Sequence, residues 1–297
     1  MLPSDQTIKL DCPAKLNLYL AILGKQADGF HALASVVAKT EFGDELDLSW
    51  IADGDCQDDR VELINSDFQS DDNTVNHAIR LFREESGITN GTFSAKLHKH
   101  IPSGAGFGGG SSDAVAALKA IQEIFPELRS SINWQGIAAR IGSDCPLFFP
   151  QGSVLMEGRG ERIIELGALK QGQLTGTQVI LFKPAFSINT AEAYRRLAEQ
   201  QLYQESKKVD ADLKDWIAGN SAFPPTCNDF ERLVETWMPS LDIVLKRLRG
   251  LNLDARMSGS GSACFVVSKY PDTEEILRKE LEKAWGQSYW LVATQIQ

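Results

Sequence analysis

The stretch from Ile101 to Leu118, IPSGAGFGGGSSDAVAAL, carries most of the information in this chain of 297 residues. It joins an alternating, strand-like segment to a helical segment through a glycine-rich loop. Glycine adopts left-handed backbone angles without strain and lets a ligand approach the main chain closely. The N–H groups at the start of a helix, together with the positive end of its dipole, attract anions. The stretch therefore predicts a phosphate-binding loop.

Known phosphate-binding patterns fit this loop poorly. Gly104, Gly106 and Gly109 satisfy G-x-G-x-x-G, but no second strand with an acidic end follows the helix, as a dinucleotide site requires. The Walker pattern fails because Gly110 stands where its lysine belongs. The protein-kinase loop lacks its V-A-I-K and H-R-D partners. A glycine-rich turn without a ligand stays open, and the coincidence of phosphate-binding features favours a loop of another type.

Hydrophobic periodicity predicts a mixed α/β chain. Alternation from Ile8 to Leu20 indicates a half-buried strand, with Lys15, Asn17 and Tyr19 on the face opposite the apolar residues. Further strands are predicted over residues 36–50, 92–100, 147–149, 179–182 and 263–267, a hairpin over 154–165, and helices over 73–85, 114–124 and 137–141. The polar residues 170–177 are the best candidate for a linker.

Composition limits the partners and the location of the protein. The formal net charge of -10 opposes binding to the phosphate backbone of nucleic acids. The cysteines are dispersed and form no C-x-x-C pair, which predicts free thiols in a reducing compartment. The N-terminus lacks a signal-peptide pattern, and no apolar run approaches the roughly 18 residues of a membrane span. We expect a cytoplasmic protein without nucleic-acid or membrane partners, and either a monomer or a dimer.

Three motifs in order resemble the signatures of the GHMP kinases, a superfamily that includes galactokinase, homoserine kinase and mevalonate kinase. They are PAKLNLYL (13–20), the glycine-rich stretch 102–114, and MSGSGSACF (257–265). The resemblance implies an α+β, two-domain GHMP kinase fold. Its N-terminal domain, 1–168, would be similar to ribosomal protein S5 domain 2, and its C-terminal domain, 169–297, would be ferredoxin-like.

Narrower features resemble one branch of this superfamily. ADGFHAL (27–33), IGSDCPLFF (141–149) and GRGE (158–161) are similar to segments of the kinases that phosphorylate 4-diphosphocytidyl-2-C-methylerythritol, a small cytidine diphosphate derivative, in the non-mevalonate isoprenoid pathway. The resemblance implies ATP and Mg²⁺ as cofactors. It also makes Asp144 the catalytic carboxylate and Lys15 its partner. Judged by residue type alone, a turn residue and a solvated lysine are the simpler interpretations, and the resemblance reverses that preference.

The resemblance further implies contacts with the nucleotide and the substrate. The positions at the nucleotide are Asn73, Lys99, Pro102, Gly104, Gly106, Gly108, Gly109, Gly110, Ser111 and Ser112, and either serine is a candidate to bind Mg²⁺. The positions at the substrate are Asn17, Phe30, His31 and Phe186. An aromatic ring suits a flat base, and imidazole can hydrogen-bond the polar edge of that base. Phe30 and Asn189 replace a more usual tyrosine and serine.

Other interpretations stay open for some of these residues. Asn73 is equally a helix N-cap, and His98 with His100 forms an H-x-H pair that lacks a third ligand for zinc. One alternative function keeps the fold but uses another small alcohol, such as mevalonate or homoserine, which the D-G-F-H segment disfavours. Another is a non-catalytic ligand sensor, which the presence of both Lys15 and Asp144 disfavours. No G-x-S-x-G motif supports a hydrolase.

Overall fold

The structure, a computed structural model, describes residues 3–26, 29, 31–65 and 72–297. The chain forms two compact units. The first comprises Met1–Ala14, Gly43–Pro102 and Gly108–Gln151, and the second comprises Lys15–Phe42, Ser103–Phe107 and Gly152–Gln297. The compact units interleave along the chain, whereas we expected two consecutive domains, 1–168 and 169–297. That domain division stays a prediction.

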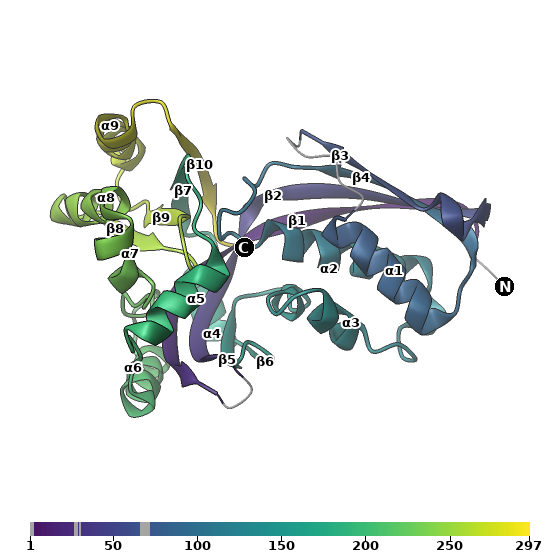
Figure 1. The fold of residues 1–297 in the computed structure, drawn as a ribbon, viewed down its shortest axis with the longest axis horizontal. Helices are drawn as coiled ribbons and strands as arrows, with labels where there is room; N and C mark the ends of the chain where they lie inside the picture. Colours follow the sequence, from purple (N-terminus) through teal and green to yellow (C-terminus); the bar gives the residue numbers. More distant parts are fainter. Residues whose placement is uncertain (1–2, 27–28, 30, 66–71) are drawn as a thin grey trace. The chain divides into compact units, whose positions relative to one another are not determined.

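The first unit is a sheet covered on one face by helices (Figure 1). Its strands are β3 (Arg60–Ile64), β4 (Asn90–His98) and parts of β1 (Gln6–Lys25) and β2 (His31–Asp55), the last two of which also supply residues to the second unit. β4 pairs with β2 in antiparallel and with β3 in parallel orientation. The helices α1 (Thr74–Ser86), α2 (Gly109–Ile124) and α3 (Trp134–Ile141) lie on the same side of this sheet (Figure 1).

Aromatic side chains form the core between α1 and the sheet. Phe82 lies 5.9 Å from Phe93, 5.4 Å from Phe125 and 5.8 Å from Trp134, measured between ring centroids. Trp50 closes the cluster at 4.9 Å from Phe93. The helical spacing predicted for residues 73–85 is confirmed, since Phe82 is fully buried on the inner face of α1.

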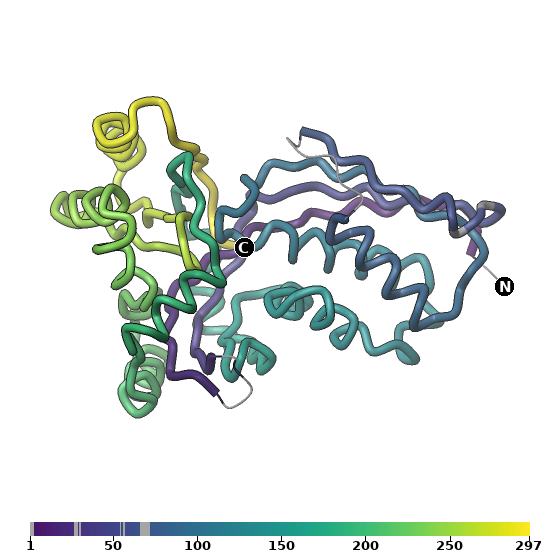
Figure 2. The backbone as a smooth tube through the Cα atoms, in the orientation of Figure 1, coloured from purple at the N-terminus to yellow at the C-terminus, as the bar shows by residue number. Residues whose placement is uncertain are grey.

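The second unit contains the ferredoxin-like sheet expected of the C-terminal half. Its strands are β7 (Gln178–Pro184), β8 (Asp254–Met257), β9 (Cys264–Val267) and β10 (Tyr289–Gln295), in the antiparallel order β10-β7-β9-β8. Numbered along the chain, this order is fourth, first, third, second, the arrangement of a split βαβ fold. Figure 2 traces the chain through these strands in green to yellow.

Helices and a hairpin complete the second unit. The helices are α4 (Ala168–Leu174), α5 (Thr190–Glu199), α6 (Ser206–Ala218), α7 (Glu231–Trp237), α8 (Pro239–Gly250) and α9 (Thr273–Trp285). The predicted hairpin is confirmed as β5 (Val154–Gly158) and β6 (Arg162–Glu165), and β5 pairs with residues 33–37 of β2. Within the part of the chain that the structure describes, none of the helices has the length and apolar character that a bilayer span needs.

Two predicted elements are wrong. The apolar run 147–149 is not a strand, because Leu147 and Phe148 lie in the short 3-10 helix η3 (Cys145–Phe148), which has Pro146 in its first turn, and Phe149 is its C-cap. Proline has no N–H for a sheet ladder and suits the first turn of a helix. Residues 170–177 are not a linker, because they lie largely in α4, where Lys170 is buried and donates to the carbonyls of Gly219 and Ser221 at 2.8 Å each.

The prediction for β1 is also wrong in one respect. Lys15, Asn17 and Tyr19 are 5%, 7% and 1% exposed, so the strand is buried on both faces and not half-buried. Period-two alternation shows which residues share a face, but it does not show whether polar residues meet solvent or other polar groups.

Phe82→Ala should lower the free energy of unfolding by about 3–5 kcal/mol, because it removes the centre of the aromatic cluster and leaves a cavity. Urea unfolding followed by tryptophan fluorescence measures this, since Trp50 and Trp134 lie in the same cluster. The matched control is Arg80→Ala on the same helix, whose exposed side chain should matter by less than about 0.5 kcal/mol. Equal losses in the two variants would contradict the assignment of the core.

Candidate active site

Segments from all three predicted motifs meet in the second unit. The backbone N–H of Lys15, on β1, donates to the carbonyl of Phe107 at 2.8 Å. The N–H of Ala263, at the start of β9, donates to the carbonyl of Ala105 at 2.8 Å. Residues 103–107 of the glycine-rich loop therefore lie between β1 and the turn 258–262 that joins β8 to β9.

The glycines in this loop are required by backbone geometry. Gly104, Gly106 and Gly108 have φ angles of 62°, 96° and 73°, which residues with a side chain rarely adopt. A Cβ on Gly106 would lie 3.0 Å from the carbonyl oxygen of Ser258. Alternate glycines thus give the loop its shape, and one of them also lets it pack against the turn 258–262.

Lys15 is held by a polar network. Its Nζ donates to Asn17 Oδ1 at 2.6 Å, and Asn17 Nδ2 donates to Ser35 Oγ at 2.8 Å. The Asn17 backbone N–H donates to Ser258 Oγ at 3.2 Å. A Cβ on Gly259 would lie 3.3 Å from Lys15 Nζ, so the turn 258–262 lies beside this ammonium. The alternative of a solvated strand lysine is wrong.

Asn228 is a site residue that the sequence did not reveal. Its Nδ2 donates to the carbonyls of Met257 and Gly259, each at 2.9 Å, and its Oδ1 accepts from the N–H of Phe230 at 3.1 Å. The side chain therefore holds the turn 258–262 in place. Nothing in the local sequence marks Asn228, because its partners come from a turn about thirty residues later.

The start of α2 packs against the turn that carries Asp144, and both belong to the first unit. Burial raises the pKa of the Cys145 thiol to about 11, and a hydrogen bond from the Ser111 hydroxyl acts in the opposite direction. Asp144 occupies the N-cap position of η3, but its side chain does not cap that helix. The turn containing Asp144 is thus placed beside the end of the glycine-rich loop.

The two serines at this helix start differ in access. Ser112 is 2% exposed, and among the described residues its Oγ has no hydrogen-bond partner. Ser111 is half-buried and lies next to the Asp144 turn. Ser111 is therefore better placed than Ser112 to reach a ligand of the loop.

Asn73 is the N-cap of α1. Its Oδ1 accepts from the N–H of Asn76 at 2.9 Å, which confirms the alternative interpretation of this residue. A Cβ on Gly110 would lie 3.5 Å from Thr74 Cγ2, so the starts of α1 and α2 are neighbours. Capping by Asn73 does not exclude its predicted contact with the nucleotide. The nucleotide contacts of Asn73 and Pro102 both stay predictions.

Lys99 lies between two buried carboxylates that the sequence analysis did not assign. Its Nζ is 2.5 Å from Asp44 Oδ2 and 2.6 Å from Asp113 Oδ2. Burial lowers the pKa of Lys99, but the two carboxylates raise it above the ordinary value. The ammonium of Lys99 is thus paired with carboxylates of the protein itself. The predicted contact of Lys99 with a nucleotide would have to come from other atoms of the residue.

The predicted substrate residues lie on separate elements of the second unit. The His31 ring stacks on Tyr194 at 5.1 Å and 29°, and burial, followed by the charge of Lys25, lowers its pKa. Phe186 is half-buried and meets Trp285 edge-on at 6.5 Å. Within the described part of the chain, neither His31 Nε2 nor Trp285 Nε1 has a hydrogen-bond partner. Phe30 lies outside the described residues.

Asn189 has a structural role. Its Oδ1 accepts from the N–H of Glu192 at 3.0 Å, and it is the N-cap of α5. Next to it, the hydroxyls of Thr190 and Ser260 are 2.9 Å apart, which links α5 to the turn 258–262. Asparagine replaces serine here with another residue that caps helices well.

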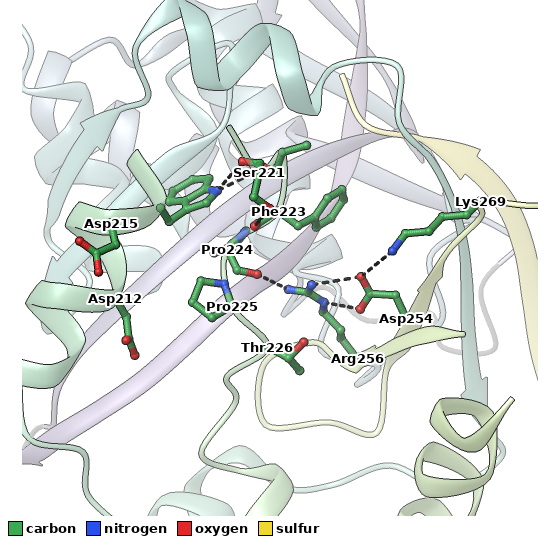
Figure 3. Close-up of a pocket in the computed structure, with 12 residues that line it drawn as sticks. Asp212, Asp215, Ser221, Phe223, Pro224, Pro225, Thr226, Asp254, Arg256 and Lys269 are labelled. Carbon is green, nitrogen blue, oxygen red and sulfur yellow. Dashed lines mark hydrogen bonds and ion pairs between the residues drawn. The ribbon is translucent and has the colours of Figure 1, made fainter. Parts of the chain in front are cut away.

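A pocket of about 640 Å³ opens elsewhere in the second unit (Figure 3). Its Arg256 is 6% exposed and donates to Asp254 and to the carbonyls of Leu18 and Pro224. These bonds satisfy the guanidinium within the protein, and none of the predicted site residues lines the pocket. Among the residues described, His, Cys, Asp and Glu side chains form no group of three or more able to hold a metal ion.

Family models match both halves of the chain. The model described as GHMP kinases N terminal domain matches residues 73–149, and the one described as GHMP kinases C terminal matches residues 210–287. The chain belongs to the GHMP kinases. The expected α+β, two-domain GHMP kinase fold is thereby confirmed.

Individual relatives narrow the assignment of this GHMP kinase. It is 33% identical to the 4-diphosphocytidyl-2-C-methyl-D-erythritol kinase of Prochlorococcus marinus (strain MIT 9303), over 98% of the chain and 94% of that protein. It is 34% identical to the chloroplastic 4-diphosphocytidyl-2-C-methyl-D-erythritol kinase of Arabidopsis thaliana, over 93% of the chain and 71% of that protein. These similarities place the GHMP kinase among the 4-diphosphocytidyl-2-C-methyl-D-erythritol kinases.

Solved structures agree with this assignment. The crystal structure of a 4-(cytidine 5'-diphospho)-2C-methyl-D-erythritol kinase matches with a TM-score of 0.75 and 27% identity, over 97% of this GHMP kinase and 99% of that chain. The homoserine kinase of Cytophaga hutchinsonii matches with a TM-score of 0.67 over 98% of this chain and 95% of its own, and its 18% identity shows a shared fold alone.

Gly106→Ala should raise the KM for ATP by about tenfold or more, because a residue forced to positive φ costs on the order of 1–3 kcal/mol and shifts the loop. Steady-state kinetics with varied ATP, together with a thermal melt, measure both effects. Gly172→Ala in α4 is the matched control, since an added Cβ there meets no atom within 4 Å. Alanine favours the helix, so this variant should match or slightly exceed the wild-type stability. An unchanged KM for ATP in Gly106→Ala would contradict the role given to this glycine.

Proposed function

We propose that this GHMP kinase transfers the γ-phosphoryl group of ATP to the 2-hydroxyl of 4-diphosphocytidyl-2-C-methyl-D-erythritol, a step of the non-mevalonate route to isoprenoid precursors. The observation that carries the proposal is the convergence of Lys15, the loop 103–107 and the turn 258–262 on one another through backbone hydrogen bonds. The relatives that bear this name over nearly the whole chain support the choice of substrate.

The backbone amides of the glycine-rich loop and the start of α2 hold the phosphates of ATP in this proposal. Bare N–H groups and the positive end of α2 provide donors for anionic oxygens. The half-buried Ser111 is the better candidate of the two serines to bind Mg²⁺. When bound, Mg²⁺ supplies positive charge that neutralises the phosphate oxygens during transfer.

Asp144 positions the acceptor hydroxyl and takes up its proton, and Lys15 supplies positive charge at the reacting groups. An ammonium near a carboxylate keeps that carboxylate ionised and favours loss of the hydroxyl proton. Support within each unit comes from the buried network around Lys15 and from the packing of the Asp144 turn against Ser111. The joint action of these two residues is part of the proposal.

Recognition of the cytidine base falls to His31 and the aromatic residues around it. Because its pKa is lowered, His31 is neutral at physiological pH and offers one donor and one acceptor nitrogen. Its Nε2 is buried and has no hydrogen-bond partner among the described residues. Buried polar atoms normally have such a partner, so a ligand is a candidate for this one. Phe186, and by the family resemblance Phe30, would provide the apolar faces for the flat ring, and Asn17 would help to position the substrate from the same strand as Lys15.

The location and partners of the protein remain proposals of the same kind. The dispersed cysteines support a reducing compartment such as the cytoplasm. The acidic net charge supports the absence of a nucleic-acid partner. Both monomer and dimer are compatible with the proposed chemistry.

Consumption of ATP should depend on the cytidine substrate. A coupled assay that supplies 4-diphosphocytidyl-2-C-methyl-D-erythritol, mevalonate or homoserine in parallel should give turnover with the first compound alone. The reason is that the base-recognition residues have nothing to bind in the two smaller alcohols. Turnover with mevalonate or homoserine instead would transfer the proposal to another substrate, and ATP binding without turnover on any alcohol would favour a sensor.

Asp144→Asn should cut turnover by several orders of magnitude, about 10²–10⁴-fold, because the amide cannot accept the hydroxyl proton. Binding of ATP, measured by calorimetry, should stay within about threefold of wild type, since the amides of the loop are unchanged. Asp11→Asn, at an exposed position of β1 in the same unit, is the control and should keep full activity. Full turnover in Asp144→Asn would remove this residue from the mechanism.

A further inference from the structure

One ion cluster joins the two ends of the glycine-rich loop within the first unit. Lys99 directly precedes the loop, after β4, and Asp113 lies in α2, just after the loop ends. The Lys99 Nζ is 2.6 Å from Asp113 Oδ2 and 2.5 Å from Asp44 Oδ2. A single ammonium therefore links the residue before the loop to a residue after it.

Asp44 adds a third anchor, from β2. Its Oδ1 accepts from the backbone N–H groups of His100 at 2.5 Å and Ile101 at 2.8 Å, and the residue is 1% exposed. A Cβ on Gly109 would lie 3.2 Å from Asp44 Oδ2, so this carboxylate lies against both ends of the loop. Figure 1 shows β2 beside β4, and their register pairs Glu45, next to Asp44, with His98.

The charges in this cluster do not balance when both carboxylates are ionised. One ammonium neutralises one carboxylate, and a net charge left in a buried site is costly. Burial, opposed by Lys99 and reinforced by Asp44, raises the pKa of Asp113 to about 7. From β1, the Cys12 thiol hydrogen-bonds Asp113 and stays neutral because burial raises its pKa, and Lys119 of α2 lies beyond that thiol. The cluster is thus neutral with one shared proton and gains a negative charge when that proton leaves.

We propose that Lys99, Asp44 and Asp113 are positioning residues that clamp the two ends of the glycine-rich loop and thereby set its affinity for ATP. This inference rests on the proposed function, because it requires the loop to hold the phosphates of ATP. Without the clamp, the segments 99–102 and 108–113 lose their link, and the amides that face the phosphates are no longer held at a fixed spacing. Binding groups that are not held at the right spacing bind ATP more weakly, and each tenfold loss of affinity corresponds to about 1.4 kcal/mol.

The clamp also predicts how ATP binding responds to pH. Below about pH 7, Asp113 shares a proton and the cluster is neutral. Above that pH, the cluster carries one extra negative charge next to the loop, and this charge repels the triphosphate. The affinity for ATP should therefore fall as pH rises through neutrality.

Lys99→Met tests the clamp directly. It should raise the KM for ATP by about 10- to 100-fold, while kcat at saturating ATP and the KM for the cytidine substrate change by less than about threefold. The double variant Lys99→Met with Asp113→Asn should regain thermal stability, because the remaining carboxylate of Asp44 is held by two backbone N–H groups. Its KM for ATP should stay high, since the two ends are still not linked. A KM that returns to the wild-type value together with the stability would overturn the clamp.

A half-buried ion pair in the same unit provides the matched control. Arg83 Nε lies 2.6 Å from Asp59 Oδ2, and the two side chains are 12% and 16% exposed. This pair joins α1 to the end of β3 that lies away from the loop. Arg83→Met should lower the melting temperature comparably but leave the KM for ATP unchanged. An equal rise of this KM in Arg83→Met would show that general destabilisation, and not the clamp, weakens ATP binding.

Asp113→Asn provides a second test if Lys99→Met fails to fold. This variant should fold, because the Asn amide oxygen still accepts a hydrogen bond from Lys99. The ATP γ-phosphate titrates near neutrality as well, so the readout is the difference between the wild-type and variant profiles of KM against pH. The wild-type KM should rise relative to that of Asp113→Asn above about pH 7. Parallel profiles would overturn the proton-sharing cluster.

Direct binding of ATP, measured by calorimetry, separates this inference from the proposed function. A wild-type chain that does not bind ATP would overturn the proposed function and the clamp with it. A wild-type chain that binds ATP, with unchanged affinity in Lys99→Met, would overturn the clamp and leave the proposed function standing.

Discussion

Three separate segments of the second unit are joined directly by hydrogen bonds between their main-chain atoms. The loop 103–107 gives its carbonyls at Ala105 and Phe107 to the N–H groups of Ala263 and Lys15. These bonds fix the loop from both sides before any ligand binds. A loop shaped in advance loses little conformational freedom on binding and presents its donors where charge develops. Gly106 follows from this constraint, since its φ of 96° disfavours a side chain and a Cβ there would lie only 3.0 Å from the carbonyl oxygen of Ser258.

Phosphate binding by an acidic protein depends on neutral donors. With a net charge of -10, this chain has no broad positive field for a triphosphate. The two lysines next to its motifs have different surroundings. Lys99 is occupied by two carboxylates, whereas Lys15 donates to the amide oxygen of Asn17. The charge of Lys99 is therefore used to hold the fold near the loop, whereas the Lys15 ammonium is held by the Asn17 amide beside the turn 258–262.

The sequence predicted those parts of the structure that depend on local patterns. The glycine-rich loop, the helical face of α1 around Phe82, and two of the four strands of the ferredoxin-like sheet, β7 and β9, follow from composition and period within short windows, whereas β8 and β10 were not predicted. Local patterns failed for Leu147, because an apolar run of three residues does not distinguish a strand from a 3-10 helix that has Pro146 in its first turn. They failed for Lys170, because a buried lysine in a polar stretch looks the same as a solvated one.

The site residues that the sequence missed are those whose partners are distant in the chain. Asp44 matters because the register of β2 with β4 places it at His100 and Ile101, and no window of sequence contains that register. Asn228 matters because it reaches the turn 258–262 from another element. Asp113 was visible as part of the loop motif, but its role depends on an ammonium fourteen residues earlier. Motifs therefore identified segments that the structure brings together around Lys15, while the supporting contacts required coordinates.

Substrate choice must come from outside the glycine-rich loop, because backbone amides distinguish a phosphate from other groups but not one alcohol from another. The buried Nε2 of His31 is an unsatisfied polar atom among the described residues, and leaving such an atom without a partner costs on the order of 1–3 kcal/mol. The ring that carries this nitrogen stacks on Tyr194. A ligand that satisfies the nitrogen recovers that free energy, and mevalonate and homoserine have no base to do so. In the proposed function, specificity for a cytidine compound then arises from the cost of this unsatisfied nitrogen, in the unit that also carries Lys15.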